Sequence, residues 1–156
     1  MNLPILKIPM INGKVYALCV GKKRGVAKRH VRSGFIKTGY GLEGDAHAMG
    51  DKRQISLLAI ERITAVNAQK NVKALPGDFA ENITTSGIDW SGVAVGSLIS
   101  IGTAKLRVME RGKPEHGVND YSFQGIALLA KEGIFAEVIE SGYIFEGDKI
   151  RVCLSY

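Results

Sequence analysis

Glycine is the residue that most constrains how this chain can fold. It fills 19 of the 156 positions, well above the average of about 7%. Glycine supplies the positive φ angles that tight turns and bulges need, and it weakens the interior of a helix. Many turns favour short strands over a helical bundle. We therefore expect a mainly β fold.

Several short runs in which apolar and polar residues alternate predict strands. These runs cover residues 15–20, 34–38, 95–101, 104–109 and 146–152. Two of them, 95–101 and 146–152, have a glycine turn before the alternating pattern, which is typical of small closed barrels. Residues 54–58 fit a strand or the entry to a helix.

Helical periodicity is present in two places. Apolar residues recur at spacings of three and four from Ala59 to Val66, which predicts an amphipathic helix ending near Gln69. A second, short helix is predicted over 126–132, with Gly133 or Gly142 at its end. The pattern over 134–140 fits a helix and a strand equally well. Two or three short helices are thus expected beside the strands.

Length and composition indicate one domain over residues 1–156, with 1–12 as an N-terminal extension. No run approaches the ~18 apolar residues of a membrane span. The two cysteines, Cys19 and Cys153, lie in apolar alternating runs. Such positions favour small buried side chains over a disulfide or a metal pair, and this usage predicts a cytoplasmic protein with no membrane partner.

The formal net charge is +6, which favours anionic small-molecule ligands and, more weakly, nucleic acid. Six of the eleven residues at 22–32 are Lys or Arg. This run contains no aromatic residue for base stacking and no nucleic-acid motif. A solvated or mobile loop is therefore favoured over a phosphate-binding arm, and nucleic acid is a disfavoured partner.

A polar stretch at 41–47 combines two glycines with Glu43, Asp45 and His47. If it is extended, these three side chains share one face, because side chains in a strand repeat every two residues. Such a face could bind a metal, a proton or a polar ligand. The alternative is a solvated Gly-Asp turn.

A second polar stretch covers 77–85. On a strand, Phe79, Glu81 and Ile83 would alternate with a largely polar face of Asp78, Ala80, Asn82 and Thr84. A polar face of this kind lies in solvent or lines a site. Asn82 favours a site, since asparagine is a poor strand former unless its amide is used.

The chain contains no phosphate-binding P-loop, no dinucleotide fingerprint, no HExxH and no paired CxxC. Asp45, His47, Glu115 and His116 could form a site for a divalent metal, but nothing in their spacing brings them together. No protein-ligated metal is therefore expected.

Four motifs occur in a diagnostic order: Gly-Leu-Glu-Gly-Asp-x-His at 41–47, Arg-Gln-Ile-Ser-Leu-Leu at 53–58, Pro-Gly-Asp-Phe-Ala-Glu-Asn-Ile-Thr-Thr-x-Gly at 76–87 and Gly-x-x-x-x-Ile-Gly at 96–102. This order resembles the MOSC domain, the C-terminal domain type of molybdenum-cofactor sulfurases, in its small stand-alone form. The resemblance extends over nearly the whole chain, from Val15 to Val152.

The resemblance implies a small β-barrel that handles molybdenum cofactor (molybdopterin) or activated sulfur. It assigns to a cofactor pocket the residues Asp45, His47, Arg53, Asn82, Thr84 and Lys113. Guanidinium pairs with phosphate in a fork, while amide and hydroxyl groups suit the edges of a pterin. The alternatives are that Arg53 pairs with Asp45 or Glu43 and that Asn82 supports a bulge.

One departure from the family bears on activity. Family members generally have a cysteine after the motif that ends here in Lys113, whereas this chain has Glu115 and His116. A carboxylate cannot hold a persulfide, because that chemistry needs a thiolate.

We therefore expect a protein that binds molybdenum cofactor or a related anion, with sulfur-carrier activity in doubt. One alternative is a metal- or acid/base-dependent enzyme in which Glu115 and His116 act with Asp45 and His47. The other is a non-catalytic accessory module that works with a partner protein in cofactor biosynthesis.

Overall fold

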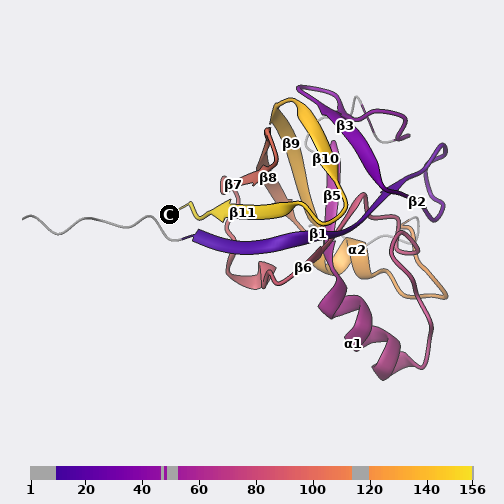
Figure 1. Ribbon diagram of the computed structural model, residues 1–156. Helices are drawn as coiled ribbons and strands as arrows, with labels where there is room; N and C mark the ends of the chain where they lie inside the picture. Colours follow the sequence, from indigo (N-terminus) through magenta and orange to yellow (C-terminus); the bar gives the residue numbers. More distant parts are fainter. Residues whose placement is uncertain (1–9, 47, 49–52, 114–119, 156) are drawn as a thin grey trace, which may run out of the picture.

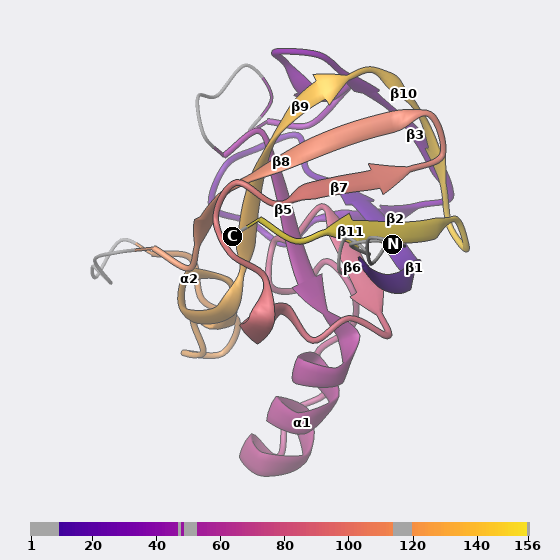
Figure 2. The same cartoon turned by 90° about the vertical axis from the view of Figure 1, so that its left-hand side faces the viewer.

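The computed structural model describes residues 10–46, 48, 53–113 and 120–155. Seven of its strands close into a barrel (Figure 1, Figure 2). Around the barrel the order is β11-β7-β8-β9-β5-β6-β1, and pairing between β1 and β11 closes the ring. The strands are β1 (Met10–Val20), β5 (Ile55–Ala59), β6 (Ile83–Ser86), β7 (Leu98–Ile101), β8 (Ala104–Arg111), β9 (Ile134–Glu140) and β11 (Lys149–Cys153). The mainly β barrel expected from the sequence is confirmed.

The remaining strands lie outside this ring. β2 (Arg29–Val31) pairs with the end of β1. A separate small sheet has the order β10-β3-β4, formed by Gly142–Phe145, Ser33–Lys37 and Gly41–Leu42. Residues 10–12, assigned from the sequence to an N-terminal extension, are the first residues of β1 and pair with β11.

Helices α1 (Ile60–Lys70) and α2 (Leu128–Glu132) and a 3-10 turn, η1 (Trp90–Gly92), complete the described chain. α1 follows β5 directly and projects from one end of the barrel (Figure 2). Among the described strands, β5 and β6 form the one parallel pair, which requires a crossover connection, and α1 belongs to it. Neither helix has the length and apolar character that a membrane crossing would require.

Alternation along the strands divides the apolar residues into two clusters. Ile55, Leu57 and Ala59 of β5 point into the barrel core with Ala136 and Val138 of β9. The outward side chain of Leu58 packs instead with Ile63 and Val66 of α1, Phe79 and Leu128. This second cluster holds both helices against the outside of the barrel.

The structure resolves the ambiguous segments. Residues 54–58 form most of β5, and residues 134–140 form β9. The predicted helix over 126–132 is shorter, because regular helix begins at Leu128; it ends before Gly133, whose N–H donates to the Leu129 carbonyl.

The prediction of a strand over residues 78–84 is wrong for the first half of this range. Gly77 and Ala80 have positive φ angles of 90° and 69°, and the Ala80 N–H donates to the Gly77 carbonyl, so the chain turns here. A side chain at Gly77 would also collide with the backbone carbonyl of Lys28. Regular strand begins only at Ile83.

The possibility that residues 41–47 form one extended stretch is also wrong for the residues described. β4 ends at Leu42, Gly44 has a φ of 86°, and the Asp45 N–H donates to the Leu42 carbonyl in a turn. Glu43 is exposed whereas Asp45 is buried, so their side chains do not share a face. His47 lies outside the described residues.

Candidate functional site

A cavity of about 330 Å³ lies on the outside of the barrel, and we call it the Arg53 cavity. Ser56 on β5 and Phe135 on β9 are cross-strand partners and point away from the core that their neighbours fill. Both side chains form part of the cavity wall. The cavity is lined by Arg24, Gly25, Arg53, Ser56, Ala80, Asn82, Lys113, Tyr121, Leu129 and Phe135.

Arg53 is held in place by two neighbouring residues. Its Nε and Nη2 groups donate to the two oxygens of Glu110, at 3.0 and 3.2 Å, and its guanidinium carbon lies 5.5 Å from the centre of the Phe135 ring. The carboxylate partner of Arg53 is therefore Glu110, and the alternative in which Arg53 pairs with Asp45 or Glu43 is wrong. A guanidinium has five N–H donors, so three remain after this fork.

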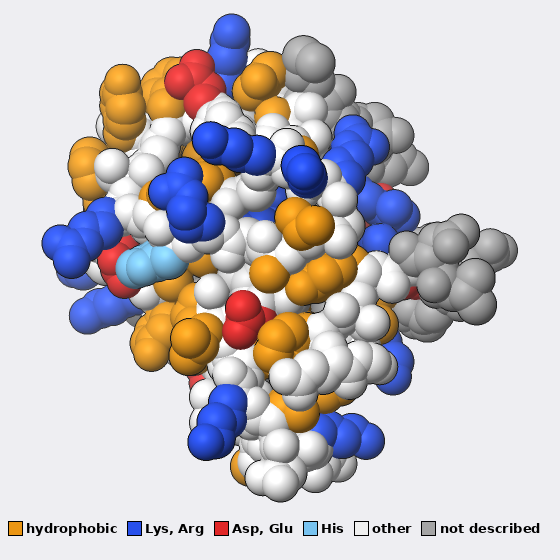
Figure 3. All heavy atoms as spheres, turned by 90° about the vertical axis from the view of Figure 1, so that its right-hand side faces the viewer, with side chains coloured by type: hydrophobic (Ala, Val, Ile, Leu, Met, Phe, Trp, Pro, Cys, Tyr) orange, Lys and Arg blue, Asp and Glu red, His pale blue; other side chains and the backbone are white. Residues whose placement is uncertain are grey.

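Two further cations line the same cavity. Lys113 follows β8, and its Nζ lies 3.2 Å from Oδ1 of Asp120. Arg24, in the exposed basic loop after β1, donates from Nε to the Ala46 carbonyl at 3.4 Å. Among the described residues, Arg24 forms no ion pair with a carboxylate. A space-filling view shows Lys and Arg side chains around exposed hydrophobic ones over the upper part of one side (Figure 3).

The polar residues at the back of the cavity are bonded to one another. The Ser56 N–H and hydroxyl both donate to the Asn82 amide oxygen, at 3.0 and 3.2 Å, and the Asn82 amide nitrogen donates to the Cys19 carbonyl. Asn82 thus joins β5 to β1, and it supports the strands while its surface lines the cavity. Thr84 is fully buried, donates to Glu81 and does not line the cavity.

Tyr121 joins the cavity to the turn before β6. Its hydroxyl donates to the Asp78 carbonyl oxygen at 2.6 Å. Partial burial, with the nearby charges of Asp78 and Glu81, raises the pKa of Tyr121 above its ordinary value. The neutral phenol uses its one O–H in this bond to Asp78.

Asp45 lies near the cavity but does not line it. Its Oδ1 accepts from the Lys28 ammonium at 2.6 Å and from the Gly21 N–H at 3.0 Å, and both charged side chains are almost completely buried. The burial of Lys28 therefore differs from the sequence prediction that residues 22–32 form a solvated loop. The pair ties the turn after β4 to the basic loop, and Ala46 from that turn accepts the Arg24 bond.

Three predicted site residues, His47, Glu115 and His116, lie outside the described residues. The acid/base hypothesis loses Asp45 as a free partner, since its carboxylate is buried against Lys28. In the part of the chain that the structure describes, no group of three His, Cys, Asp or Glu side chains is placed to hold a metal ion.

The two cysteines do not replace the family thiol. Both are free, and neither lines the Arg53 cavity. Burial, and secondarily the charge of Glu81, raises the pKa of Cys19 to about 12. Cys153, on β11, is partly exposed. Cys19 is therefore a neutral, buried thiol, as the apolar pattern around it predicted.

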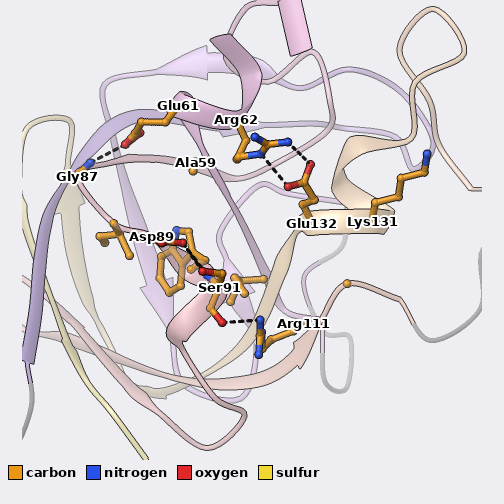
Figure 4. A pocket seen from close by; sticks show the side chains of 13 residues that line it. Ala59, Glu61, Arg62, Gly87, Asp89, Ser91, Arg111, Lys131 and Glu132 are labelled. Carbon is orange, nitrogen blue, oxygen red and sulfur yellow. Dashed lines mark hydrogen bonds and ion pairs between the residues drawn. The ribbon is translucent and has the colours of Figure 1, made fainter. Parts of the chain in front are cut away.

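A larger cavity of about 960 Å³ lies at one end of the barrel, between α1, η1 and α2 (Figure 4). Its positive and negative groups are equal in number, and two of them form an ion pair. Arg62 donates to both oxygens of Glu132, and Arg111 donates to the Ser91 carbonyl. Three carboxylates and three cations line this end cavity: Glu61, Asp89, Glu132, Arg62, Arg111 and Lys131. It therefore has no excess of positive charge.

Sequence reasoning selected Arg53, Asn82 and Lys113, which the structure brings to one cavity. It missed Arg24, Phe135 and Tyr121. The basic run contained Arg24, but nothing in the run distinguished it from Lys22 or Lys23. Phe135 gave no separate signal, because its segment fitted helix and strand equally well.

Comparisons with known proteins agree with this architecture. The MOSC domain family model matches residues 44–151, more than half of the chain. No curated protein sequence matches the chain.

Crystal structures of three bacterial proteins share the fold at low identity. The YuaD protein from Bacillus subtilis is 19% identical, with a TM-score of 0.77 over 95% of this chain and 99% of that one. YiiM from Geobacillus stearothermophilus is 20% identical, with a TM-score of 0.71 over 92% of this chain and 75% of that one. YiiM from Escherichia coli is also 20% identical, with a TM-score of 0.66 over 92% and 71%. With the family match, the closed barrel and its outer cavity, the chain belongs to the MOSC domain family.

Proposed function

We propose that this protein binds an anionic ligand of the molybdopterin type in the Arg53 cavity. One observation carries the proposal: three cationic side chains and no acidic one line the cavity among the described residues. Glu110 and Asp120, which do not line the cavity, pair with Arg53 and Lys113. The three lining cations and the two carboxylates bonded to them together leave a surplus positive charge that an anion would neutralise.

The cavity suits a flat group that carries a phosphate. Its volume lies near the lower end of the range for small-molecule sites. The nearly buried Phe135 ring adds apolar wall beside Arg53, and Arg53, Arg24 and Lys113 offer N–H donors that pair strongly with phosphate oxygens. The Asn82 amide already forms hydrogen bonds to Ser56 and Cys19. It would therefore shape the cavity wall and would not form hydrogen bonds with the edge of a pterin.

Within this proposal the chain's own residues bind and orient the ligand. Arg53, fixed by Glu110, would act as a preorganised fork, and Arg24 and Lys113 would contact the phosphate. When bound, molybdenum cofactor supplies a redox-active metal centre. The proposal includes no sulfur transfer through this chain's cysteines, since Cys19 is buried and Cys153 does not line the cavity.

The test is to purify the full chain from a host that makes molybdenum cofactor and from one that lacks molybdopterin synthesis. Oxidised pterin is then measured by fluorescence after denaturation. We expect pterin only with protein from the first host, and much less of it with Arg53→Gln. Pterin absent from the wild-type protein, together with no binding when molybdopterin is titrated, would contradict the proposal.

Arg107→Gln is the matched control. Arg107 is also an outward-facing arginine on the barrel, paired with Glu137 at 3.2 Å and exposed to a similar degree. It does not line the cavity. Its replacement should leave the pterin content unchanged.

A further inference from the structure

Glu81 is a buried carboxyl group between two residues of the Arg53 cavity wall. Ala80 and Asn82 line the cavity, whereas the Glu81 side chain is 0% exposed. The Thr84 hydroxyl donates to its Oε2 at 2.8 Å. Its Oε1 is buried and has no hydrogen-bond partner of standard geometry. A buried polar atom without a partner is costly, and in native proteins such atoms are often functional.

The groups that face Glu81 do not neutralise its charge. Asp78 in the preceding turn, Cys19 on β1 and Tyr121 before α2 interact with it electrostatically. None of these is a cation, and no ion pair with Glu81 is formed by the described residues. The nearby ammonium of Lys28 is bonded to Asp45.

This environment favours the neutral acid. Burial is the largest cause, and it raises the pKa of Glu81 to about 7. The backbone N–H dipoles of Glu81 itself and of Gly77 and the bond from the Thr84 hydroxyl favour the charged form and oppose that rise, and Asp78 adds to it. Both protonation states are thus accessible near neutral pH.

We propose that Glu81 is the proton acceptor of the Arg53 cavity, so that an anion is bound together with a proton. This inference rests on the proposed function and deepens it. Tyr121 lines the cavity and is close enough to Glu81 for the charge of Glu81 to act on its phenol. A bound anion would act on the Glu81 carboxyl in the same way, because like charges favour protonation of a carboxylate. Binding of an anion in the cavity should therefore weaken as pH rises above neutrality.

The direction of the pH dependence follows from the thermodynamic linkage between anion binding and proton binding. A site that binds the anion better when Glu81 is protonated takes up a proton on binding wherever free Glu81 is ionised. Uptake should be a measurable fraction of one proton per anion near pH 8 and fall to about zero near pH 5.5, where Glu81 already holds its proton. Affinity should decline by up to about tenfold per pH unit above neutrality.

The test is calorimetric titration of the full chain with inorganic sulfate, whose own charge is constant over this range. Titrations near pH 8 in two buffers of different ionisation enthalpy give the number of protons taken up. We expect substantial uptake for the wild-type protein and for Glu140→Gln, an exposed control, and almost none for Glu81→Gln. Sulfate binding without proton uptake, or uptake that persists in Glu81→Gln, would overturn this inference but would not contradict the proposed anion site.

A second measurement covers the case in which Glu81→Gln does not fold. The carboxyl ¹³C shift of Glu81 is followed with pH in the wild-type protein, with and without sulfate, and Thr84→Val identifies the signal by its displacement. We expect sulfate to raise the midpoint of the titration, and an unchanged midpoint would overturn the inference. No binding of sulfate at any pH would contradict the proposed anion site itself.

Discussion

The guanidinium group of Arg53 lies 5.5 Å from the centre of the Phe135 ring and donates two hydrogen bonds to Glu110. Glu110 and Phe135 are cross-strand partners on β8 and β9, so the barrel itself fixes both supports. The result is a cation with a set orientation at the wall of a cavity. Preorganisation of this kind favours ligand binding, because less conformational entropy is lost on association.

Replacing Arg53 should therefore affect ligand binding more than stability. Hydrogen bonds to charged groups contribute about 1.5–3 kcal/mol, so Arg53→Gln should weaken anion binding roughly 10- to 100-fold. The Arg53 side chain is 41% exposed, and its loss should change the free energy of unfolding by no more than about 1 kcal/mol. Titration and urea denaturation measure the two effects. Equal affinities for wild type and Arg53→Gln would refute this prediction.

The buried pair of Lys28 and Asp45 should be sensitive to the loss of one partner. Asp45→Asn leaves an ammonium without its carboxylate, and breaking a buried pair in this way costs about 3–5 kcal/mol. Adding Lys28→Met should recover part of that loss, because the buried positive charge that Asp45 neutralised is removed. Urea denaturation of the wild-type protein and the two variants measures these changes in the free energy of unfolding.

The exposed pair Lys105–Glu140 is the matched control, and Lys105→Gln should cost less than about 1 kcal/mol. An Asp45→Asn protein as stable as this control would show that the buried pair has no structural role.

Glu81 should make stability fall with pH. Burial raises its pKa from 4.5 to about 7, so between these values the folded chain holds a proton that the unfolded chain has lost. The stability linked to that proton is complete below about pH 4.5 and disappears as pH rises to about 7, a total of about 3 kcal/mol. Glu81→Gln should flatten this part of the pH profile relative to Glu140→Gln. Parallel profiles for the two variants would rule out a proton on buried Glu81.

The two thiols should differ in reactivity. Alkylation requires the thiolate, and burial with a pKa of about 12 keeps Cys19 neutral. Cys153 is partly exposed and should react with iodoacetamide near pH 8 while Cys19 stays unmodified until the protein unfolds. Mass spectrometry of the alkylated peptides checks this. Rapid modification of Cys19 in the folded protein would reopen the question of a sulfur carrier.

Period-two alternation predicted most of the barrel strands, because each strand has one face in the core, as with Leu106 and Val108 of β8. The same rule failed at Asp78 to Asn82, where positive φ angles at Gly77 and Ala80 turn the chain. A non-glycine residue with positive φ is uncommon, so a regular pattern could not reveal it.

The candidate site was harder to predict than the strands. Motif order pointed to Arg53, Asn82 and Lys113, but the partner of Arg53 is Glu110, which lies 57 positions away. That pairing depends on the register between β8 and β9, which contains irregular steps. Long-range register of this kind is set by tertiary packing rather than by local sequence.

The most direct test of the central claim is a molybdopterin titration that compares the two cavities. Arg24→Gln and Lys113→Gln alter the Arg53 cavity, whereas Arg111→Gln and Lys131→Gln alter the end cavity. We predict that each of the first two variants weakens binding by about tenfold, since each removes a charged donor, and that the other two bind as the wild type does. Loss of affinity only in the end-cavity variants, or in none of the four, would contradict the account.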